Sequence, residues 1–433
     1  MKRLAVIGAG AGGMFCAAQL GKIAGLEISV YEASDSPLKK VLLSGGGRCN
    51  FTNTATDTEN PKDFYPRGAR YLRKPFKRFA CTQTREVFAS LGVRSKVEDC
   101  GRVFPTSDDS RTIANALAKA AKGAKFRFST RAKALEKTEV GTWRIGIESG
   151  GETEFAEADF VLIATGGTWD ESLAKSVEKL GGKFVPPVPS LFSLKAQNAE
   201  NSLAKLAGIS APDAKLSATA CGETFVSRGA VLFTHFGLGG PAVLALSAFG
   251  ARAFAQCGYK FDIAADWICG VSEEEFFRRI NRAREDSPKK LARNTPLFGV
   301  AKALWEHACG RVGAAEKLWA NFSKADAAAL RQALKSDKIR VSGKSAHKGE
   351  FATCGGLDCE CVDFKTCSLK GEDSLFFSGE CLDIDAITGG FNLQAAWTTA
   401  KICADAIAEK MKIFKKNRKF FLQFRNKCTN IQS

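Results

Sequence analysis

The stretch that decides the fold is Leu4-Ala-Val-Ile-Gly8-Ala-Gly10-Ala-Gly-Gly13, at the start of a 433-residue chain. Its apolar beginning is typical of a buried parallel strand, and the residues that follow, 14–20, have the pattern of an opening helix. Between them lies the spacing Gly-x-Gly-x-x-Gly. These glycines permit a tight turn, the close approach of a pyrophosphate and close packing of helix on strand. The stretch therefore predicts a dinucleotide-binding unit.

A second predicted strand, residues 27–31, ends in Glu32, which lies 19 residues after Gly13. That is the spacing expected of an acid that accepts hydrogen bonds from the adenosine ribose. A glycine turn that only packs a helix on a strand is the alternative, but it explains neither the second strand nor the acid. The unit recognises the ADP half that NAD and FAD share, so both cofactors remain open at this point.

The composition is that of a soluble protein, with 45% hydrophobic and 25% charged residues. The N-terminus lacks a secretory apolar region, and residues 4–20 are too short and too rich in glycine to span a bilayer. The fifteen cysteines are scattered along the chain, which favours buried thiols in a reducing compartment. We therefore expect a cytoplasmic protein without a transmembrane segment.

A metal site is not expected. The one cysteine cluster, Cys354, Cys359, Cys361 and Cys367, contains no C-x-x-C pair, and its spacing fits alternating positions of a strand better than a zinc or iron–sulfur site. The chain has only three histidines, which leaves little for a histidine-based site.

The formal net charge is +17, and two stretches stand out as basic. Residues 410–433 hold eight Lys or Arg and no acid, and residues 62–78 interleave basic and aromatic side chains. Such stretches are typical of nucleic-acid binding, but also of a solvated basic face beside an anionic cofactor. The tail, 411–433, places aromatic residues at helical spacing. It is either an amphipathic helix that touches anionic surfaces or a loose terminus.

Two later strands also end in glycine, at Ala164-Thr-Gly-Gly167 and at Ser378-Gly-Glu380. Both can join the opening unit at one edge of a parallel sheet, which predicts a discontinuous nucleotide-binding domain. Gly389-Gly390 opens a long helix to about residue 410, and its N-terminus would stabilise the negative charge of a reduced flavin. This late helix favours FAD over NAD.

The remaining pattern predicts helices at 107–122, 273–284, 297–309, 313–321 and 325–335, and a linker at Val185-Pro-Pro-Val-Pro-Ser190. In the first of these helices, Asp108 and Asp109 are expected to lie in the first turn, where the helix dipole favours acids.

Four long stretches resemble the YhiN/BaiN-like family of bacterial FAD-containing flavoproteins: residues 43–53, 101–105, 232–241 and 377–394. The resemblance implies an α/β fold with a Rossmann-type FAD-binding domain interrupted by a β-barrel-like domain, which itself carries a helical insertion. The corresponding boundaries are 1–188 with 347–410 for the FAD-binding domain, 189–268 with 338–346 for the β-rich domain, 269–337 for the helical insertion and 411–433 for the basic tail.

The resemblance also assigns cofactor-binding residues. It places Gly8, Gly10, Gly13 and Glu32 on the ADP portion, Ser44, Gly45, Gly46, Arg48, Cys49 and Asn50 along the cofactor, Thr165 and Gly166 beside it, and Gly379, Glu380, Asp383, Gly390, Phe391, Asn392 and Leu393 at the flavin end. After the glycines at 166–167 the chain departs from the family pattern, reading Thr168-Trp-Asp-Glu. Contacts that the family makes from that loop are therefore not carried over.

Catalytic side chains are less defined, because the flavin performs the electron transfer. His235, in a glycine-rich loop, is a candidate acid or base, and Cys49, beside an arginine that would lower its pKa, is a candidate redox thiol. A hydrogen-bonded loop histidine and a packed cysteine are the respective alternatives.

The resemblance implies an FAD-dependent oxidoreductase that reduces activated double bonds of a small-molecule substrate with NADH or NADPH. The sequence contains no second Gly-x-Gly-x-x-Gly followed by an acid, so a separate NAD(P)H domain is not indicated and NAD(P)H would dock transiently over the flavin. Amine oxidation is the alternative activity, and an RNA-associated flavoprotein that uses the basic stretches is the alternative of another class.

Overall fold

The computed structural model describes residues 1–197, 203–345 and 352–429. The chain divides into two compact units, Met1–Pro187 with Ala352–Ser433 (unit 1) and Val188–Phe351 (unit 2). The expected boundary between residues 346 and 347, and the end of the tail beyond Thr429, lie outside the described residues. Among the residues that are described, no helix combines the length and apolar character needed to cross a bilayer.

Unit 1 is built on a seven-stranded sheet. Its order is β19 (Val362–Asp363), β20 (Ser368–Leu369), β21 (Glu372–Phe377), β10 (Phe160–Ile163), β1 (Lys2–Ile7), β2 (Leu26–Tyr31) and β6 (Lys125–Arg127). The strands from β21 to β6 are parallel, so their carboxyl ends share one edge. The centre of the sheet, β10, is buried throughout, as expected of a parallel strand covered on both faces.

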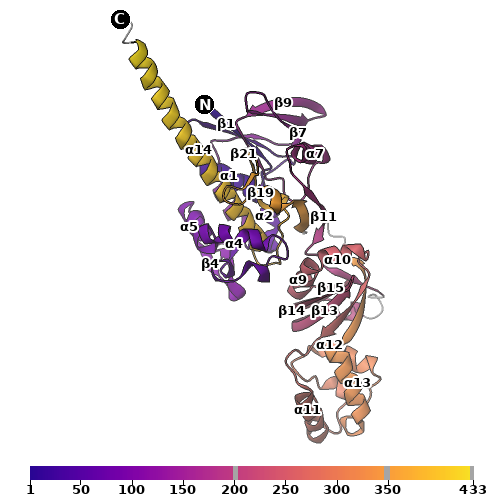
Figure 1. The fold of residues 1–433 in the computed structure, drawn as a ribbon. Helices are drawn as coiled ribbons and strands as arrows, with labels where there is room; N and C mark the ends of the chain where they lie inside the picture. Colours follow the sequence, from indigo (N-terminus) through magenta and orange to yellow (C-terminus); the bar gives the residue numbers. More distant parts are fainter. Residues whose placement is uncertain (198–202, 346–351, 430–433) are drawn as a thin grey trace. The chain divides into compact units, whose positions relative to one another are not determined.

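Helices and small sheets surround this sheet (Figure 1). The helices of unit 1 are α1 (Ala11–Leu20), α2 (Lys39–Leu43), α3 (Ala55–Thr58), α4 (Ala69–Arg78), α5 (Cys81–Ser90), α6 (Ser110–Ala120), α7 (Glu171–Lys179) and α14 (Phe391–Thr429). One small sheet joins β3 (Thr52–Asn53), β5 (Arg102–Pro105) and β4 (Ser95–Val97), and another joins β7 (Thr130–Lys137), β8 (Trp143–Ser149) and β9 (Glu152–Ala158).

Three local predictions for these elements are corrected. Helix α6 begins at Ser110, not at 107, because the carboxylate of Asp109 accepts a hydrogen bond from the Arg111 N–H (2.9 Å) and so caps the helix from outside. Asp108 has a positive φ of 52° and also lies before the helix. The expected linker is the strand β11 (Phe184–Ser190), which pairs with β18 (Ala352–Leu357). Its prolines are tolerated because the sheet has only two strands, both of them edges.

Unit 2 contains a closed six-stranded barrel. The order is β12 (Leu194–Ala196), β15 (Gly237–Gly239), β14 (Glu223–Thr234), β13 (Ser210–Ala220), β16 (Phe261–Asp266) and β17 (Asp337–Lys344). Buried and exposed positions alternate along β13 and β17, as expected of barrel strands. Helices α9 (Pro241–Phe249) and α10 (Ala251–Gln256) follow β15. The predicted fold class, a Rossmann-type α/β domain with an inserted barrel, is confirmed.

A helical segment joins β16 to β17 and consists of α11 (Glu273–Asp286), α12 (Lys302–Arg311) and α13 (Lys324–Lys335). The helix expected at 313–321 is wrong. Apart from one 3₁₀ turn, Trp319–Asn321, this stretch is irregular, because its backbone pairs with residues 288–292. The Trp319 N–H donates to the Lys290 carbonyl at 3.0 Å, and the Ala292 N–H donates to the Lys317 carbonyl at 2.9 Å.

Helix α14 packs beside α1 and is fixed by a buried polar network (Figure 1). The side-chain oxygen of Gln394 accepts from the hydroxyls of Thr52 and Thr84, the latter at 3.0 Å. The Gln394 amide donates to the Thr398 hydroxyl at 2.9 Å, and the Trp397 indole N–H donates to the Phe51 carbonyl at 2.8 Å. The first turns of the last helix are thus hydrogen-bonded to the segment that follows the first βαβ unit.

Replacing Gln394 by Leu keeps the side-chain volume and removes the acceptor that two buried hydroxyls share. Because buried hydroxyls without partners are costly, we expect the free energy of unfolding to fall by about 2–4 kcal/mol. Urea titration followed by tryptophan fluorescence measures the change. The exposed Lys415→Gln on the same helix is the control and is expected to shift stability by less than about 0.5 kcal/mol. A similar small shift for both variants would contradict the prediction.

Candidate functional site

The site lies at the edge of the unit 1 sheet where the carboxyl ends of β1, β10 and β21 lie side by side. The segments that follow these strands are in contact. A Cβ on Gly8 would overlap the carbonyl of Ala164, and one on Gly12 would overlap the hydroxyl of Ser378. Three of the predicted glycine-rich motifs are therefore brought together at one edge, which is where ligands bind in open α/β sheets.

Different physical constraints favour glycine at the three glycine positions of the opening turn. Gly8 has a φ of +106°, and a side chain on Gly13 would overlap the Gly8 carbonyl, so both are needed by the protein itself. Gly10 has an ordinary φ of −78°, and a Cβ there would meet no protein atom within 4 Å. The space before Gly10, at the N-terminus of α1, is open, which fits the close approach of a pyrophosphate.

Glu32 is oriented by the turn that it follows. Its carboxylate accepts hydrogen bonds from the Ala9 N–H (2.7 Å) and from the Ser34 N–H (2.8 Å) and hydroxyl (2.7 Å). Ionised carboxylate oxygens accept more than one hydrogen bond each, so acceptor capacity remains for a ribose. The interaction with Ala9 also fixes the acid beside the glycine turn.

The loop 44–50 is a second open cradle. Gly45, Gly46 and Gly47 all have positive φ, and a Cβ on Gly46 or Gly47 would point into open space. The loop ends at Asn50, whose buried side-chain oxygen has no hydrogen-bond partner among the described residues. A buried oxygen without a partner is unfavourable, so it is expected to accept a hydrogen bond from a bound group. The flavin N–H groups are suitable donors, which makes Asn50 a good fit to FAD.

The N-terminus of α14 adjoins this loop. A Cβ on Gly390 would lie 2.6 Å from the Thr52 carbonyl oxygen and 2.9 Å from the unpaired oxygen of Asn50, and Gly390 has a φ of +92°. Only glycine allows the helix to start this close to the loop. The first N–H groups of a helix have no partner within it, so those of α14 are available to an anionic edge of a flavin.

Phe391 and Asn392 support this helix start. The Phe391 ring stacks on Phe64 with the ring centroids 4.4 Å apart. The Asn392 amide bonds both backbone groups of Ala386, accepting from its N–H at 2.9 Å and donating to its carbonyl at 3.0 Å. Leu393 is half-buried in the same turn. These side chains hold the turn in place.

The residues that follow β10 and β21 make polar contacts with neighbouring segments of unit 1. The Glu380 carboxylate forms an ion pair with Lys40 (2.6 Å) and accepts from the Thr353 N–H (2.8 Å). Asp383 accepts from the Gly355 N–H at 2.8 Å, and the Gly379 N–H donates to the Thr399 hydroxyl at 2.9 Å. Thr165 and Gly166 follow β10, with Gly166 beside Glu380.

Arg48 does not lower the pKa of the Cys49 thiol, contrary to the expectation from their positions in sequence. The Arg48 guanidinium bonds Glu98 and Asp108 and covers the Phe104 ring at 4.1 Å. Cys49 is fully buried, and this burial raises the pKa of its thiol to about 12. At neutral pH the thiol stays protonated, which is the state of a packed cysteine and is unsuited to redox chemistry.

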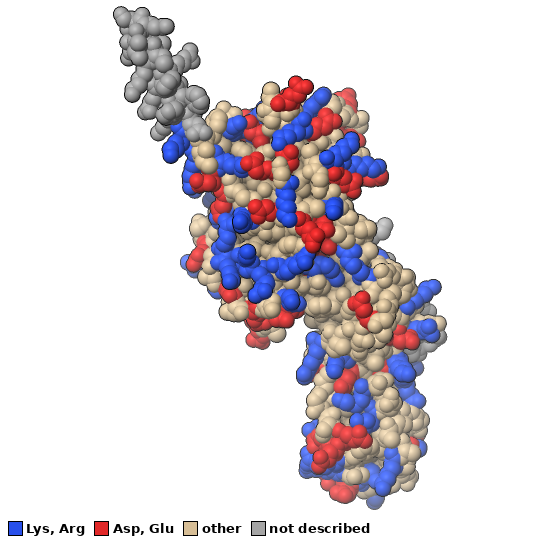
Figure 2. Space-filling model, viewed as in Figure 1, with Lys and Arg blue, Asp and Glu red and all other residues tan. Residues whose placement is uncertain are grey.

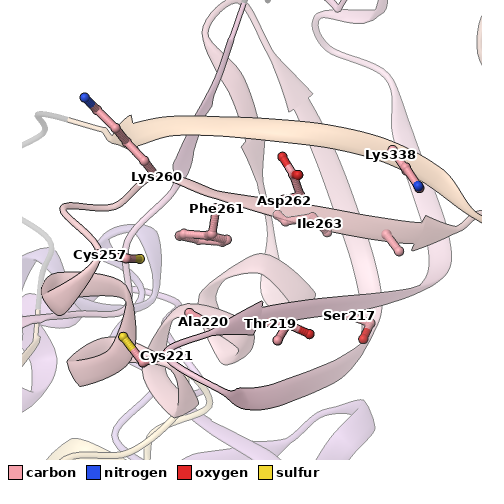
Figure 3. A pocket seen from close by; sticks show the side chains of 11 residues that line it. Ser217, Thr219, Ala220, Cys221, Cys257, Lys260, Phe261, Asp262, Ile263 and Lys338 are labelled. Carbon is pink, nitrogen blue, oxygen red and sulfur yellow. The ribbon is translucent and has the colours of Figure 1, made fainter.

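His235 lies in unit 2, in the exposed turn between β14 and β15. Its role as an acid or base stays a prediction. A pocket of the same unit lies between β13 and β16, lined by Cys221, Cys257, Lys260 and Asp262 among others (Figure 3). None of the predicted cofactor-binding residues line this pocket.

No group of three or more potential metal ligands occurs in the part of the chain that the structure describes. The expectation that the four clustered cysteines share one strand is wrong, because they lie in separate elements. Cys354 is in β18, Cys359 and Cys361 are in a 3₁₀ turn, and Cys367 lies before β20. The segment that departs from the family pattern is structural: the Trp169 indole N–H donates to the Cys381 carbonyl at 3.0 Å.

Residues that the sequence pattern did not indicate hold the segment 64–67 against the start of α14 and the residues just before it. The Tyr65 hydroxyl donates to the Phe391 carbonyl at 2.7 Å, and burial holds the pKa of this phenol well above its usual value, so it remains a donor. Arg67 forms an ion pair with the buried Asp385. The basic pattern at 62–78 was the available signal, but it does not distinguish this inward-facing arginine from its exposed neighbours.

The parallel sheet, the open cradles at Gly10 and 46–47, and the unpaired oxygen of Asn50 form a Rossmann-type site that fits FAD. The protein is an FAD-dependent oxidoreductase. The chain belongs to the family described as "HI0933-like protein Rossmann domain", whose model matches residues 2–406. The family predicted from the four motif stretches is thereby confirmed.

Several relatives match nearly the whole chain. Two of them are named ribosomal RNA dihydrouridine synthase. The Escherichia coli protein is 29% identical over 94% of this chain and 98% of its own length. The Haemophilus influenzae protein is 27% identical over 94% of this chain and 98% of its own length. A 3-dehydro-bile acid delta(4,6)-reductase from Clostridium scindens is 26% identical over 95% of this chain and all of that protein.

Gly10→Ala tests the cradle. The backbone there suits alanine and no protein atom is displaced, so the fold is expected to keep its stability while FAD affinity falls at least about tenfold. Flavin fluorescence titration of the apoprotein measures the affinity. The matched variant Gly13→Ala overlaps the Gly8 carbonyl and is expected to lower the melting temperature as well. Unchanged FAD affinity in Gly10→Ala would contradict the assignment.

Cys49 is expected to resist alkylation. At pH 8 a thiol with a pKa of about 12 is almost entirely protonated and, being buried, is also inaccessible. Iodoacetamide should modify the exposed Cys100 and Cys221 in the native protein, and Cys49 only after unfolding in urea. Peptide mass spectrometry resolves the three sites. Native modification of Cys49 at the rate of Cys100 would restore it as a redox candidate.

Proposed function

We propose that the protein reduces an activated carbon–carbon double bond, with NADH or NADPH as the source of electrons. The three relatives support this reaction class. Forming dihydrouridine adds two hydrogens across a uracil double bond conjugated to a carbonyl, and a delta(4,6)-reductase acts on double bonds conjugated to a 3-oxo group. Both need a hydride at the far carbon of the conjugated system and a proton at the nearer one. FAD, when bound, supplies the hydride.

The observation that carries the proposal is the meeting of the α14 N-terminus with the loop 44–50 at the sheet edge. The first N–H groups of α14 would stabilise the negative charge that a flavin gains on reduction. The Asn50 oxygen would accept a hydrogen bond from the same ring system and so orient it. Gly10 and Glu32 would hold the other end of the dinucleotide, which fixes the ring by binding energy remote from the reaction.

We propose uracil in RNA as the substrate. Two of the three relatives act, by their names, on ribosomal RNA, and the net charge of +17 suits a polyanionic substrate. A small conjugated ketone is the second candidate, and the bile-acid reductase favours it. In either case the proton donor is unassigned, with His235 a candidate.

The test begins with anaerobic mixing of the holoprotein with NADH or NADPH, which is expected to bleach the flavin absorbance. Deproteinised ribosomal RNA added next should restore the oxidised spectrum, and mass spectrometry of the digested RNA should show dihydrouridine. Failure of both nucleotides to bleach the flavin would overturn the reductase and favour amine oxidation, measured as oxygen consumption with amines. Reoxidation by a conjugated ketone but not by RNA would overturn the RNA substrate.

A further inference from the structure

The exposed face of α4 is entirely cationic. Its exposed side chains are Arg70, Arg73, Lys74, Lys77 and Arg78 (the α4 stripe), while Leu72, Pro75 and Phe76 face inward and are buried. From residue 64 to residue 85 the sequence contains no acid, so the helix cannot neutralise its own charge. Figure 2 shows Lys and Arg gathered as a band over the part of unit 1 where Figure 1 places α4.

Other segments neutralise only part of the α4 stripe. Arg70 pairs with Glu360 at 2.6 Å, and Arg78 lies 3.9 Å from Asp405. Within the described ranges, Arg73, Lys74 and Lys77 have no acidic partner within 4.0 Å. Three neighbouring cations without counter-charges repel one another, which destabilises a bare surface and favours an anionic partner.

The α4 stripe is attached to the flavin end of the site. The segment just before α4 is fixed to the start of α14 by the Phe64–Phe391 stack and the Tyr65 hydrogen bond. The Ile387 N–H also donates to the Phe64 carbonyl at 2.9 Å, and Arg67 pairs with Asp385. A molecule held on α4 is therefore held by an element that also positions the α14 N-terminus.

We propose that the α4 stripe binds the phosphate backbone of the RNA substrate and brings one strand to the flavin end of unit 1. This rests on the proposed function, whose substrate it places. A ten-residue helix is about 15 Å long, enough for a few successive phosphates of one strand. Arg73, Lys74 and Lys77 supply charges to the backbone without reading the sequence, so they set affinity and position while the site selects the base.

An anionic membrane is the competing partner for a basic helix. Helices that lie on membranes bury an exposed apolar face among their cations. On α4 the large apolar side chains Leu72 and Phe76 are already buried inside unit 1. The stripe therefore offers charge without an apolar face to insert, which favours a hydrated polyanion such as RNA.

The triple variant Arg73→Gln, Lys74→Gln, Lys77→Gln tests the proposal. The matched control is Lys119→Gln, Lys122→Gln, Lys179→Gln, which removes the same charge from exposed lysines of unit 1 outside α4. Binding of both variants to a fluorescent fragment of ribosomal RNA is measured by anisotropy over a series of salt concentrations. We expect the α4 variant to bind at least about tenfold more weakly and to lower the salt slope by about 2, because each lost contact with a single strand removes about 0.7.

The other readouts separate this proposal from the proposed function. FAD content and the rate of flavin bleaching by NAD(P)H should be unchanged in both variants, while dihydrouridine formation should fall only in the α4 variant. If the wild type forms dihydrouridine and the α4 variant binds and reacts as the control does, the stripe proposal is overturned and the proposed function stands. If the wild type binds phosphatidylglycerol vesicles through α4 and not RNA, the proposal is overturned in favour of a membrane surface.

Discussion

The structure of unit 1 depends on how α14 is held against the segment 50–53. Gln394 links buried threonines from three different elements, and Trp397 donates to the Phe51 carbonyl. Broken hydrogen bonds in such a buried network are costly, so the helix has one position along this segment. That position puts Gly390 against Thr52 and Asn50. The proposed flavin end of the site therefore follows from packing between residues more than 300 positions apart.

The two ends of the cofactor site are built by different kinds of constraint. At the ADP end, strand, turn, helix and acid are neighbours in sequence, and Ala9 bonds Glu32 directly. At the flavin end, α14, the loop 44–50 and the segment 64–67 are brought together only by tertiary contacts. The α4 stripe continues from that second assembly, so the proposed RNA-binding surface and the proposed flavin end share one support.

The electrostatic partners of charged side chains were predicted poorly from the charges nearby in sequence. Arg48 was expected to lower the pKa of Cys49, but two acids from later in the chain bind the arginine, and burial raises the thiol pKa. Arg67 belongs to the same basic run as Arg73, yet Arg67 is paired with a buried acid, whereas Arg73 is exposed and has no acidic partner among the described residues. A side chain's neighbours in sequence do not determine its electrostatic partners, because the chain folds back with other charges.

The sequence by itself determined the glycine turn, the position of Glu32, the family and the FAD-binding fold, since these depend on spacings within short segments or on long specific motifs. Only the tertiary structure decided that β11 is a strand, that residues 313–321 pair with 288–292 instead of forming a helix, and that Asn50 faces Gly390. Backbone groups bond whichever partner lies nearest in space, and that partner is fixed by the packing of the whole chain.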